Sequence, residues 1–414
     1  MSDRLHAFAG VGIELEYMIV DRHTLSVLPV ADELLREAEG SYTSEVKRGK
    51  LGWSNELVLH LIELKNVRPD SALEPLVAAF QDEVRHINRL LDPLGARLMP
   101  SGMHPWMDPR AETRIWPHDN AIIYQTYHRI FDCKRHSWAN LQSMHVNLPF
   151  TEDAEFARLH AAVRLVLPIL PALAASSPIA EGRRTGWLDY RMEAYRTHPL
   201  RVPSLIGQVI PDTVMSRAEY EANILAPMYR DIAPHDPENA LRHEWLNCRG
   251  AIARFDRNAI EIRVIDVQEC PQADLAIAAA IVAVVRALYD AQWAPLPAQQ
   301  GIGTDGLANI LLTCIRDAEQ AAIDDAEYLR LLGFPGCRCE ARELWQHLIE
   351  TTLRDSPDYR EAWQEPLHTM LEQGPLARRI LRGVGPDYSG AHLQAVYREL
   401  CDCLEQGMMF LGPD

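Results

Sequence analysis

The stretch Val11-Gly12-Ile13-Glu14-Leu15-Glu16-Tyr17 alternates apolar and acidic side chains near the start of the chain. Successive side chains of a β-strand point to opposite faces, so Glu14 and Glu16 share one face and the apolar residues around them share the other. Two carboxylates about 4 Å apart repel by about 4 kcal/mol at an effective dielectric constant near 20. A concave site that collects several such groups therefore needs cations, protons or water, and Mg²⁺, which prefers oxygen ligands, is the expected ion. The alternative is that both glutamates lie on the solvated face of a half-buried strand.

Composition sets limits on the class of protein. The 414 residues are 47% hydrophobic, enough for one large domain or two to three smaller ones. The net charge of -17 argues against nucleic acid and membrane surfaces as partners, because both require a basic surface. The apolar stretches 161–180 and 273–289 contain arginine or proline, so we predict core helices and not membrane spans. Residues 1–10 lack a basic start followed by an apolar run, so we expect no secretory leader and a cytoplasmic protein.

The eight cysteines are spread too thinly for a disulfide framework, and we expect free thiols. The pairs Cys337/Cys339 and Cys401/Cys403 are the only clusters. A zinc site is the alternative there, but the C-x-C spacing differs from the usual C-x-x-C. We therefore predict buried or incidental thiols.

The pattern of apolar residues predicts strands that alternate with long helices. Apolar residues three and four apart predict an amphipathic helix over 73–91, ended by Pro93 and Gly95. Residues 55–65 read as one strand with polar residues among apolar ones. The other expected elements are strands at 143–148 and 259–267 and helices at 155–175 and 273–291. Together these elements predict an α+β fold.

A linker with proline and glycine is expected at 294–305, which places a domain boundary near residue 300. Residues 1–300 carry the candidate chemical residues, and residues 301–414 are predicted to be mostly helical. The chain has neither a P-loop nor a G-x-G-x-x-G motif, so those phosphate-binding loops are excluded.

Five further residues have side chains suited to a polar site. Glu56 and Glu63 are seven apart, so on a regular strand they point to opposite faces and share a site only if a bulge or bend intervenes. His145 lies on an apolar strand, either as a hydrogen-bonded core histidine or as a contact to metal or phosphate. Glu261 and Arg263 share a strand face, as a surface ion pair or as groups that handle a metal nucleotide.

In their order and spacing these motifs resemble the carboxylate-amine ligases related to glutamate-cysteine ligase. The resemblance covers roughly residues 8–290 and includes a segment similar to the family's substrate-side loop, with Ser176-Ser177-Pro178, Gly182, Thr185-Gly186 and Tyr190-Arg191. It implies a fold of the glutamine synthetase/guanido kinase type, in which helices pack behind a curved antiparallel sheet.

The resemblance also implies the chemistry. ATP and two or three Mg²⁺ would lie on the concave face of the sheet. A substrate carboxylate would attack the γ-phosphate, and an amine would then displace phosphate from the acyl phosphate. Arg263, beside Glu261, would stabilise the transferring phosphoryl group, and Arg191 would bind the α-carboxylate of the acid unless it forms a surface ion pair with Asp189 or Glu193. The residues that match the family's metal ligands are Glu14, Glu16, Glu56, Glu63, His145 and Glu261.

The expected activity is therefore that of an ATP-dependent carbon-nitrogen ligase of class EC 6.3. It would join the side-chain carboxylate of glutamate, or a similar acid, to an amino group, with cysteine as the default acceptor by resemblance. A phosphotransferase on the same fold and a non-catalytic nucleotide- or metal-binding protein are the alternatives. No motif identifies the acceptor or the oligomeric state, although residues 103–106 and 187–201 are expected to choose the amine.

Overall fold

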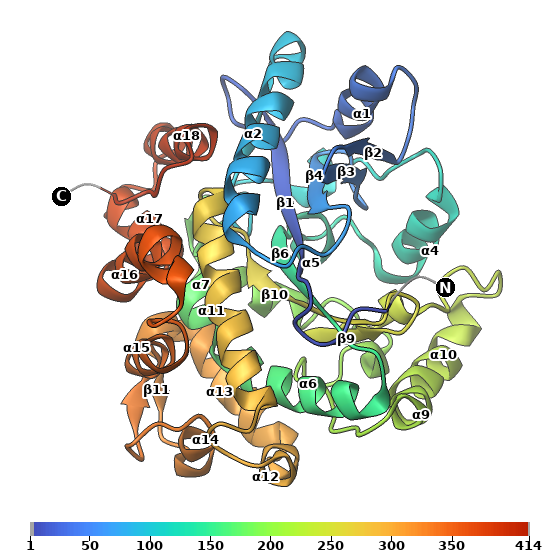
Figure 1. Ribbon diagram of the computed structural model, residues 1–414. Coiled ribbons are helices and arrows are strands. Elements are labelled where there is room, and N and C mark those ends of the chain that lie inside the picture. The colour runs from blue at the N-terminus through green and yellow to red at the C-terminus, as the bar shows by residue number, and fades with distance from the viewer. Residues whose placement is uncertain (1–3, 413–414) are drawn as a thin grey trace.

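The strand that carries Glu14 and Glu16 lies at the centre of an antiparallel sheet (Figure 1). The computed structural model describes residues 4–412, so residues 1–3 of the segment analysed for a leader lie outside the described part. The strand order is β2-β3-β4-β1-β6-β10-β9, and β5 pairs with the end of β1. The strands of this sheet are β1 (Gly12–Asp21), β2 (Glu45–Arg48), β3 (Leu51–Asn55), β4 (Leu61–Asn66), β5 (Ala96–Met99), β6 (Ser143–Pro149), β9 (Ala251–Arg254) and β10 (Ala259–Asp266).

The alternation in β1 divides the strand as predicted. Ile13, Leu15 and Tyr17 are fully buried in the main hydrophobic core, while Glu14 and Glu16 point to the other face. Burial of the apolar set fixes the register, because a slip of one residue would drive the carboxylates into the core.

The prediction of a single strand over 55–65 is wrong. Strand β3 ends at Asn55, β4 begins at Leu61, and a five-residue connection joins them. The connection is hard to recognise in the sequence because three of its five residues are apolar and none is more than half-exposed. Val58 is 2% exposed and pairs with Ile115, while the buried His60 contacts the carbonyl oxygen of Ala139 through Nε2 at 2.8 Å. Turn residues such as glycine and proline are absent, so the pattern resembles a continuous strand.

Helices pack against the sheet and extend the core away from it. Helix α2 crosses the sheet beside α11, and the C-terminal helices lie beyond α11 (Figure 1). The longer helices are α1 (Ala31–Glu39), α2 (Glu74–Leu91), α4 (Ala121–Phe131), α6 (Asp153–Val166), α10 (Ala226–Ile232), α11 (Pro271–Tyr289), α13 (Thr304–Asp317), α15 (Ala341–Thr352), α16 (Gln364–Gln373), α17 (Leu376–Val384) and α18 (Gly390–Gln406). Shorter helices are α3 (Pro109–Glu112), α5 (His136–Ala139), α7 (Leu170–Ala174), α8 (Tyr190–Tyr195), α9 (Arg217–Tyr220), α12 (Leu296–Gly301) and α14 (Ala326–Leu331). Two small hairpins pair β7 (Ile179–Ala180) with β8 (Arg183–Arg184) and β11 (Ala322–Ile323) with β12 (Cys339–Glu340).

Two segments are long and apolar enough to cross a membrane, and both lie in the core. They span 153–174 and 271–289, and 94% and 72% of their apolar windows are buried. The first is not one helix, because a 3₁₀ turn at Leu167–Ile169 separates α6 from α7. Pro168 and Pro171 lack the N–H that a continuous helix needs, which explains this break.

The region after residue 300 is mostly helical, as predicted. The segment 294–305, expected as an irregular linker, instead contains helix α12. Residues on both sides of position 300 contribute to one hydrophobic cluster, which includes Ile281 of α11 and Trp345 of α15. The division into residues 1–300 and 301–414 stays a prediction.

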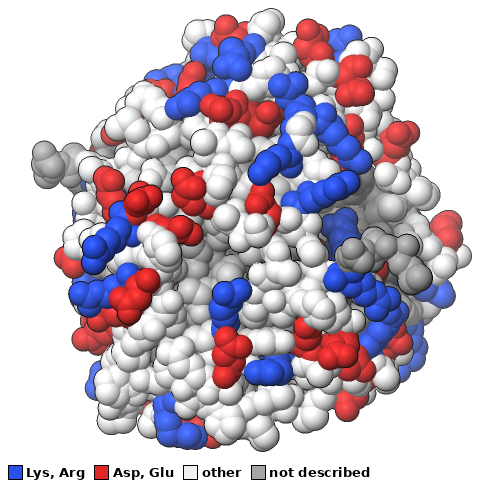
Figure 2. Space-filling view, in the orientation of Figure 1, with Lys and Arg blue, Asp and Glu red and all other residues white. Residues whose placement is uncertain are grey.

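Charged side chains of both signs are interspersed over the face drawn in Figure 2. Lysines and arginines gather at its upper right, where Figure 1 shows β2 and β3. The excess of acidic residues is therefore not collected into one patch on this face.

A buried ion pair joins the end of the sheet region to the C-terminal helices. Arg379 of α17 donates through Nη1 to Glu269, just after β10, and also to the carbonyl oxygen of Phe410. Both charged side chains are 0% exposed. Removal of one partner from such a pair leaves the other charge buried and uncompensated.

We expect Glu269→Gln to lower the free energy of unfolding by about 3 kcal/mol, because Arg379 would keep its charge without a counter-ion. Urea denaturation followed by circular dichroism measures the change. Glu405→Gln is the matched control, since Glu405 pairs with Arg97 at 3.2 Å but is 44% exposed, and it should cost less than about 1 kcal/mol. Equal effects of the two substitutions would contradict the role of burial.

Candidate active site

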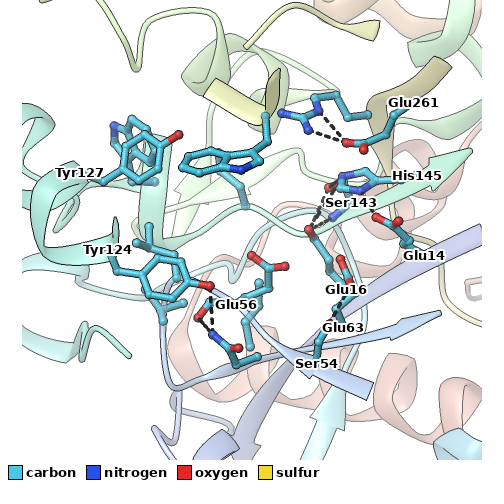
Figure 3. Close-up of a pocket in the computed structure, with 18 of the residues that line it drawn as sticks. Glu14, Glu16, Ser54, Glu56, Glu63, Tyr124, Tyr127, Ser143, His145 and Glu261 are labelled. Carbon is cyan, nitrogen blue, oxygen red and sulfur yellow. Dashed lines mark hydrogen bonds and ion pairs between the residues drawn. The ribbon is translucent and has the colours of Figure 1, made fainter. Parts of the chain in front are cut away.

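The register of the sheet brings the predicted acidic residues together. Glu14 lies opposite His145 of β6, and Glu16 lies opposite Glu63 of β4. Directly opposed residues of antiparallel strands point to the same face. Four predicted site residues from three neighbouring strands therefore converge on one cavity (Figure 3).

Glu56 enters the same cavity from the connection between β3 and β4. The turn supplies the bend that the seven-residue spacing from Glu63 requires. No hydrogen bond to the carboxylate of Glu56 is found within residues 4–412, whereas Glu63 accepts from Ser54 Oγ at 2.8 Å and from Lys65 Nζ at 2.9 Å. Glu56 is thus an acceptor without a donor.

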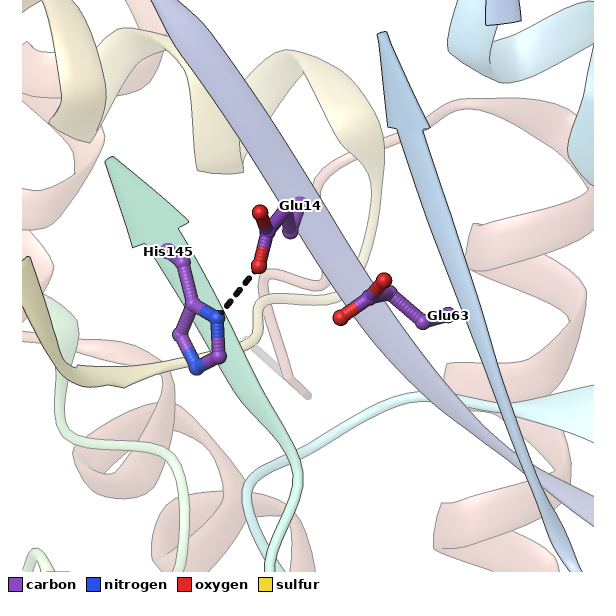
Figure 4. Close-up of side chains that lie close together, drawn as sticks. All are labelled: Glu14, Glu63 and His145. Carbon is purple, nitrogen blue, oxygen red and sulfur yellow. Dashed lines mark hydrogen bonds and ion pairs between the residues drawn. The ribbon is translucent and has the colours of Figure 1, made fainter. Parts of the chain in front are cut away.

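Two groups of side chains have the geometry of a cation site. One contains Glu14, Glu63 and His145 (Figure 4), and the other contains Glu16, Glu56 and Glu63. Within each group the ligand atoms lie within 4.8 Å of one another. Carboxylate oxygens with a single imidazole form a donor set that suits a hard divalent cation such as Mg²⁺.

Burial and neighbouring charges shift the pKa values of the glutamates in this cluster in different directions. Burial raises the pKa of Glu56 well above its ordinary value, and repulsion from Glu63 and Glu16 adds to the effect. Burial also raises the pKa of Glu16, although His145 and Ser143 oppose the rise. Burial acts on Glu63 in the same way, but Lys65 and His145 outweigh it and lower its pKa. A bound cation would relieve the repulsion that Glu56 and Glu16 experience.

His145 balances part of this negative charge. Burial alone would lower its pKa, but the hydrogen bond to Glu14 (Nδ1 to Oε2, 2.7 Å) and the charge of Glu16 raise the pKa to about 9. His145 is therefore protonated near neutral pH when no cation is bound. His145 is hydrogen-bonded, as one of the two alternatives expects, and it also lines the cavity. Its contact with a metal or phosphate stays a prediction.

Glu261 and Arg263 lie on one face of β10 and line the cavity, as their spacing predicts. Arg263 donates through Nε and Nη2 to Oε1 of Glu261, while Arg254 of β9 donates to Oε2 at 3.1 Å. Burial would raise the pKa of Glu261, but Arg263, His145 and Arg254 outweigh it and hold the pKa far below its usual range. Glu261 is 2% exposed, so the pair is not a surface ion pair.

Arg191 is fully buried, which excludes the surface ion pair with Asp189 or Glu193. Its Nε donates to Oδ1 of Asp266, while its backbone N–H donates to Ser177 Oγ at 3.0 Å. Its Nη2 has no partner among the described residues, and the residue lines the cavity. One edge of the guanidinium is thus fixed by Asp266, and the other remains available.

The cavity encloses about 590 Å³. Several residues that line the cavity were not predicted from the sequence. Lys65 carries a readable signal, because it lies two positions after Glu63 and so shares its strand face. Ser143 carries the same signal, because it lies two positions before His145. Arg254 carries none, since its contact with Glu261 depends on strand register. Of the two segments expected to choose the amine, 187–201 contributes to the lining and 103–106 does not.

Comparison with known proteins places this arrangement in a family. The model of glutamate-cysteine ligase family 2 (GCS2) matches residues 10–399. The chain belongs to this family. An uncharacterised protein of Archaeoglobus fulgidus is 31% identical over 401 residues, which cover 97% of this chain and 100% of that protein.

Other members of glutamate-cysteine ligase family 2 share shorter regions. A Rubrobacter xylanophilus protein, provisionally named glutamate–cysteine ligase 2-3, is 28% identical over 46% of this chain and 49% of its own length. The chain therefore spans about half the length of that relative. A crystal structure of glutamate–cysteine ligase from Francisella tularensis in complex with AMP has a TM-score of 0.59 and 12% identity, over 96% of this chain and 89% of that one. This likeness shows a shared fold, and the family membership supports a carboxylate-amine ligase.

We expect a substitution in the acidic cluster to stabilise the ion-free protein, whereas a usual core substitution destabilises it. Glu56→Gln removes a half-buried carboxylate whose charged form is repelled by Glu63 and Glu16, so it should raise the melting temperature of the ion-free protein by about 1 to 3 °C. It should also reduce the further rise that Mg²⁺ produces in the wild type, because one ligand is lost.

Differential scanning fluorimetry with and without MgCl₂ measures both effects. Glu37→Gln, which removes an exposed charge from α1, should change neither value. A Glu56→Gln variant that melts at a lower temperature and responds fully to Mg²⁺ would contradict the cation site.

Proposed function

We propose that this protein is an ATP- and Mg²⁺-dependent ligase of the cytoplasm that joins the side-chain carboxylate of a glutamate-like acid to an amine. The observation that carries the proposal is that all the site residues predicted from the sequence, namely five glutamates, His145, Arg191 and Arg263, line one cavity of a family member. A purely structural role, or the binding of an uncharged ligand, would not require so many negative charges so close together.

Two ion sites are proposed, one at Glu14, Glu63 and His145 and one at Glu16, Glu56 and Glu63. Magnesium bound there would neutralise the phosphate oxygens of ATP. Glu261 completes the proposed ligand set. A bound ion would share the carboxylate of Glu261 with Arg254 and Arg263. Arg263 lies beside it, where its guanidinium can stabilise negative charge on the phosphoryl group during transfer.

The proposed reaction has two steps. An oxygen of the substrate carboxylate attacks the γ-phosphorus, the bond to ADP breaks, and an acyl phosphate forms. The amine nitrogen then bonds to the acyl carbon, phosphate leaves with the electron pair, and the nitrogen loses a proton. Arg191 holds the acid by its α-carboxylate through the guanidinium edge that Asp266 leaves free.

An assay of ATP turnover tests the proposal directly. Purified protein with ATP, Mg²⁺ and glutamate should release ADP and phosphate at an appreciable rate only when an amine is added. Phosphate transfer to the acid or another acceptor without free phosphate would identify a phosphotransferase. ATP binding without turnover over a broad panel of acids and amines would identify a binding protein.

The metal ligands should be essential for turnover and dispensable for folding. We expect Glu14→Gln, Glu63→Gln and Glu261→Gln each to lower kcat by about a hundredfold or more, since each removes charge from an ion site and preserves shape. Steady-state ADP release at limiting Mg²⁺ measures the loss, and Glu37→Gln serves as the control. Near-wild-type rates in all three variants would refute the proposed ion sites.

Arg191 should affect the acid and not the nucleotide. Arg191→Lys keeps the charge but loses the planar pair of donors, so we expect glutamate binding to weaken by about 1.5 to 3 kcal/mol. The KM for ATP should change little. Parallel titrations of glutamate and ATP measure the difference, and equal losses for both would indicate a structural role.

Arg263 should act most strongly in the transition state. We expect Arg263→Ala to lower kcat far more than it raises the KM for ATP. The fold should persist because Arg254 still neutralises Glu261. Kinetics and thermal unfolding of this variant check the assignment, and a loss of kcat below about threefold in a folded protein would remove it.

A further inference from the structure

One side of the cavity differs chemically from the acidic floor. Helices α4, α5 and α8, the turns that follow them and the 3₁₀ turn Glu244–Leu246 contribute rings and apolar side chains to it. Arg191 of α8 also lines the cavity, and no acidic residue of the described chain lines it from these segments. We call this side the aromatic wall. Its rings are those of Tyr124, Tyr127, Trp138, Tyr195, His198 and Trp245.

The rings of the aromatic wall pack against one another. Trp138 lies 5.1 Å from Tyr127 and 4.6 Å from His198 between ring centroids, and Trp245 lies 5.9 Å from Tyr127. Burial lowers the pKa of His198 to about 3, so its ring is neutral at pH 7. The wall is therefore an uncharged, flat-sided surface. Trp138 and Trp245 remain partly exposed within the fold.

The chemistry of the proposed ligase leaves two uncharged groups that could occupy this wall. The triphosphate and the reacting carboxylate need the cations and polar groups of the floor. Figure 3 shows Tyr124 and Tyr127 across the cavity from Glu14, His145 and Glu261. The basic residues Arg254 and Arg257 lie in or just after β9, on the floor side. The adenine ring of ATP and the body of the amine are the parts that remain. The segment 187–201, which is expected to choose the amine, contributes Tyr195 and His198 to the wall, so we assign the wall to the amine. A neutral aromatic surface favours a ring over a small polar side chain.

We propose that the acceptor amine carries a planar aromatic ring that packs against the aromatic wall. This inference rests on the proposed function and specifies its amine substrate. The ring would stack on or meet the edges of Trp138 and Trp245, and the amine nitrogen would point to the acyl carbon above the floor. The bonds made and broken are those of the amide-forming step above, and the nitrogen releases its proton to water. A cysteine side chain would leave most of the wall in contact with water.

A panel of amines tests the proposal in the full-length wild-type protein. Phosphate release is measured with ATP, Mg²⁺ and glutamate as phenylalanine, tyrosine, tryptophan, phenethylamine, tyramine, cysteine or alanine is varied, and products are identified by mass. We expect at least one aromatic amine to have a kcat/KM at least tenfold above those of cysteine and alanine. Preference for cysteine or alanine would overturn the inference and leave the proposed ligase intact.

Variants of the wall test the contact itself. Trp138→Ala and Trp245→Ala, from separate segments, should each lower kcat/KM for the aromatic amine at least tenfold, with the KM for ATP changed less than twofold. Trp138→Phe should retain most of the activity because it keeps a ring. Trp293→Ala is the matched control, since Trp293 is a partly buried tryptophan that packs on Gly333 outside the cavity lining.

Two other outcomes would overturn the inference in different ways. A rise in the KM for ATP in both tryptophan variants, with the amine unaffected, would mean that the wall holds the adenine ring. Absence of phosphate release with every amine would remove the proposed function together with the inference. Circular dichroism spectra of the variants separate these results from loss of folding.

Discussion

The mutual repulsion of carboxylates on one sheet face is the constraint on which the rest of the site depends. Strand β1 places Glu14 and Glu16 between the neighbouring strands that carry His145 and Glu63, so the register that buries the apolar face also concentrates the charge. The large apolar core on the opposite face stabilises this register. Lys65 neutralises Glu63, and Arg254 and Arg263 both neutralise Glu261. Glu56 is left without a donor among the described residues. The proposed divalent cation would relieve this local repulsion.

The elements with strong periodicity were predictable, and so was the face of β1 that carries the glutamates. Strands β1, β6 and β10 and helices α2 and α11 follow from side-chain alternation or from apolar residues three and four apart. The connection between β3 and β4 was not predictable, because it carries three apolar residues and lacks turn-forming glycine or proline. A turn whose side chains are buried by tertiary contacts has the same local pattern as a strand.

The candidate site likewise contains residues that were predictable from the sequence and residues that were not. Residues of a single strand, such as Glu261 and Arg263, could be paired from their spacing alone. Partners on other strands depend on register, which distant parts of the chain determine. Asp266 shows this limit, since it contacts Arg191 across 75 positions of sequence. Its Oδ2 also accepts hydrogen bonds from Ser176 N and Ser177 Oγ at 2.8 and 2.7 Å, so a whole loop is organised around one carboxylate.

The position of Glu56 outside regular secondary structure has a consequence for how the site can diversify. Glu16 and Glu63 are held by the ladders of hydrogen bonds between strands, whereas Glu56 is carried by a short connection between them. Insertions or substitutions in a connection disturb a sheet less than changes within its strands. If the two proposed cation sites exist, related proteins could alter the size and charge of the one that contains Glu56, while the other keeps ligands that are all carried by strands.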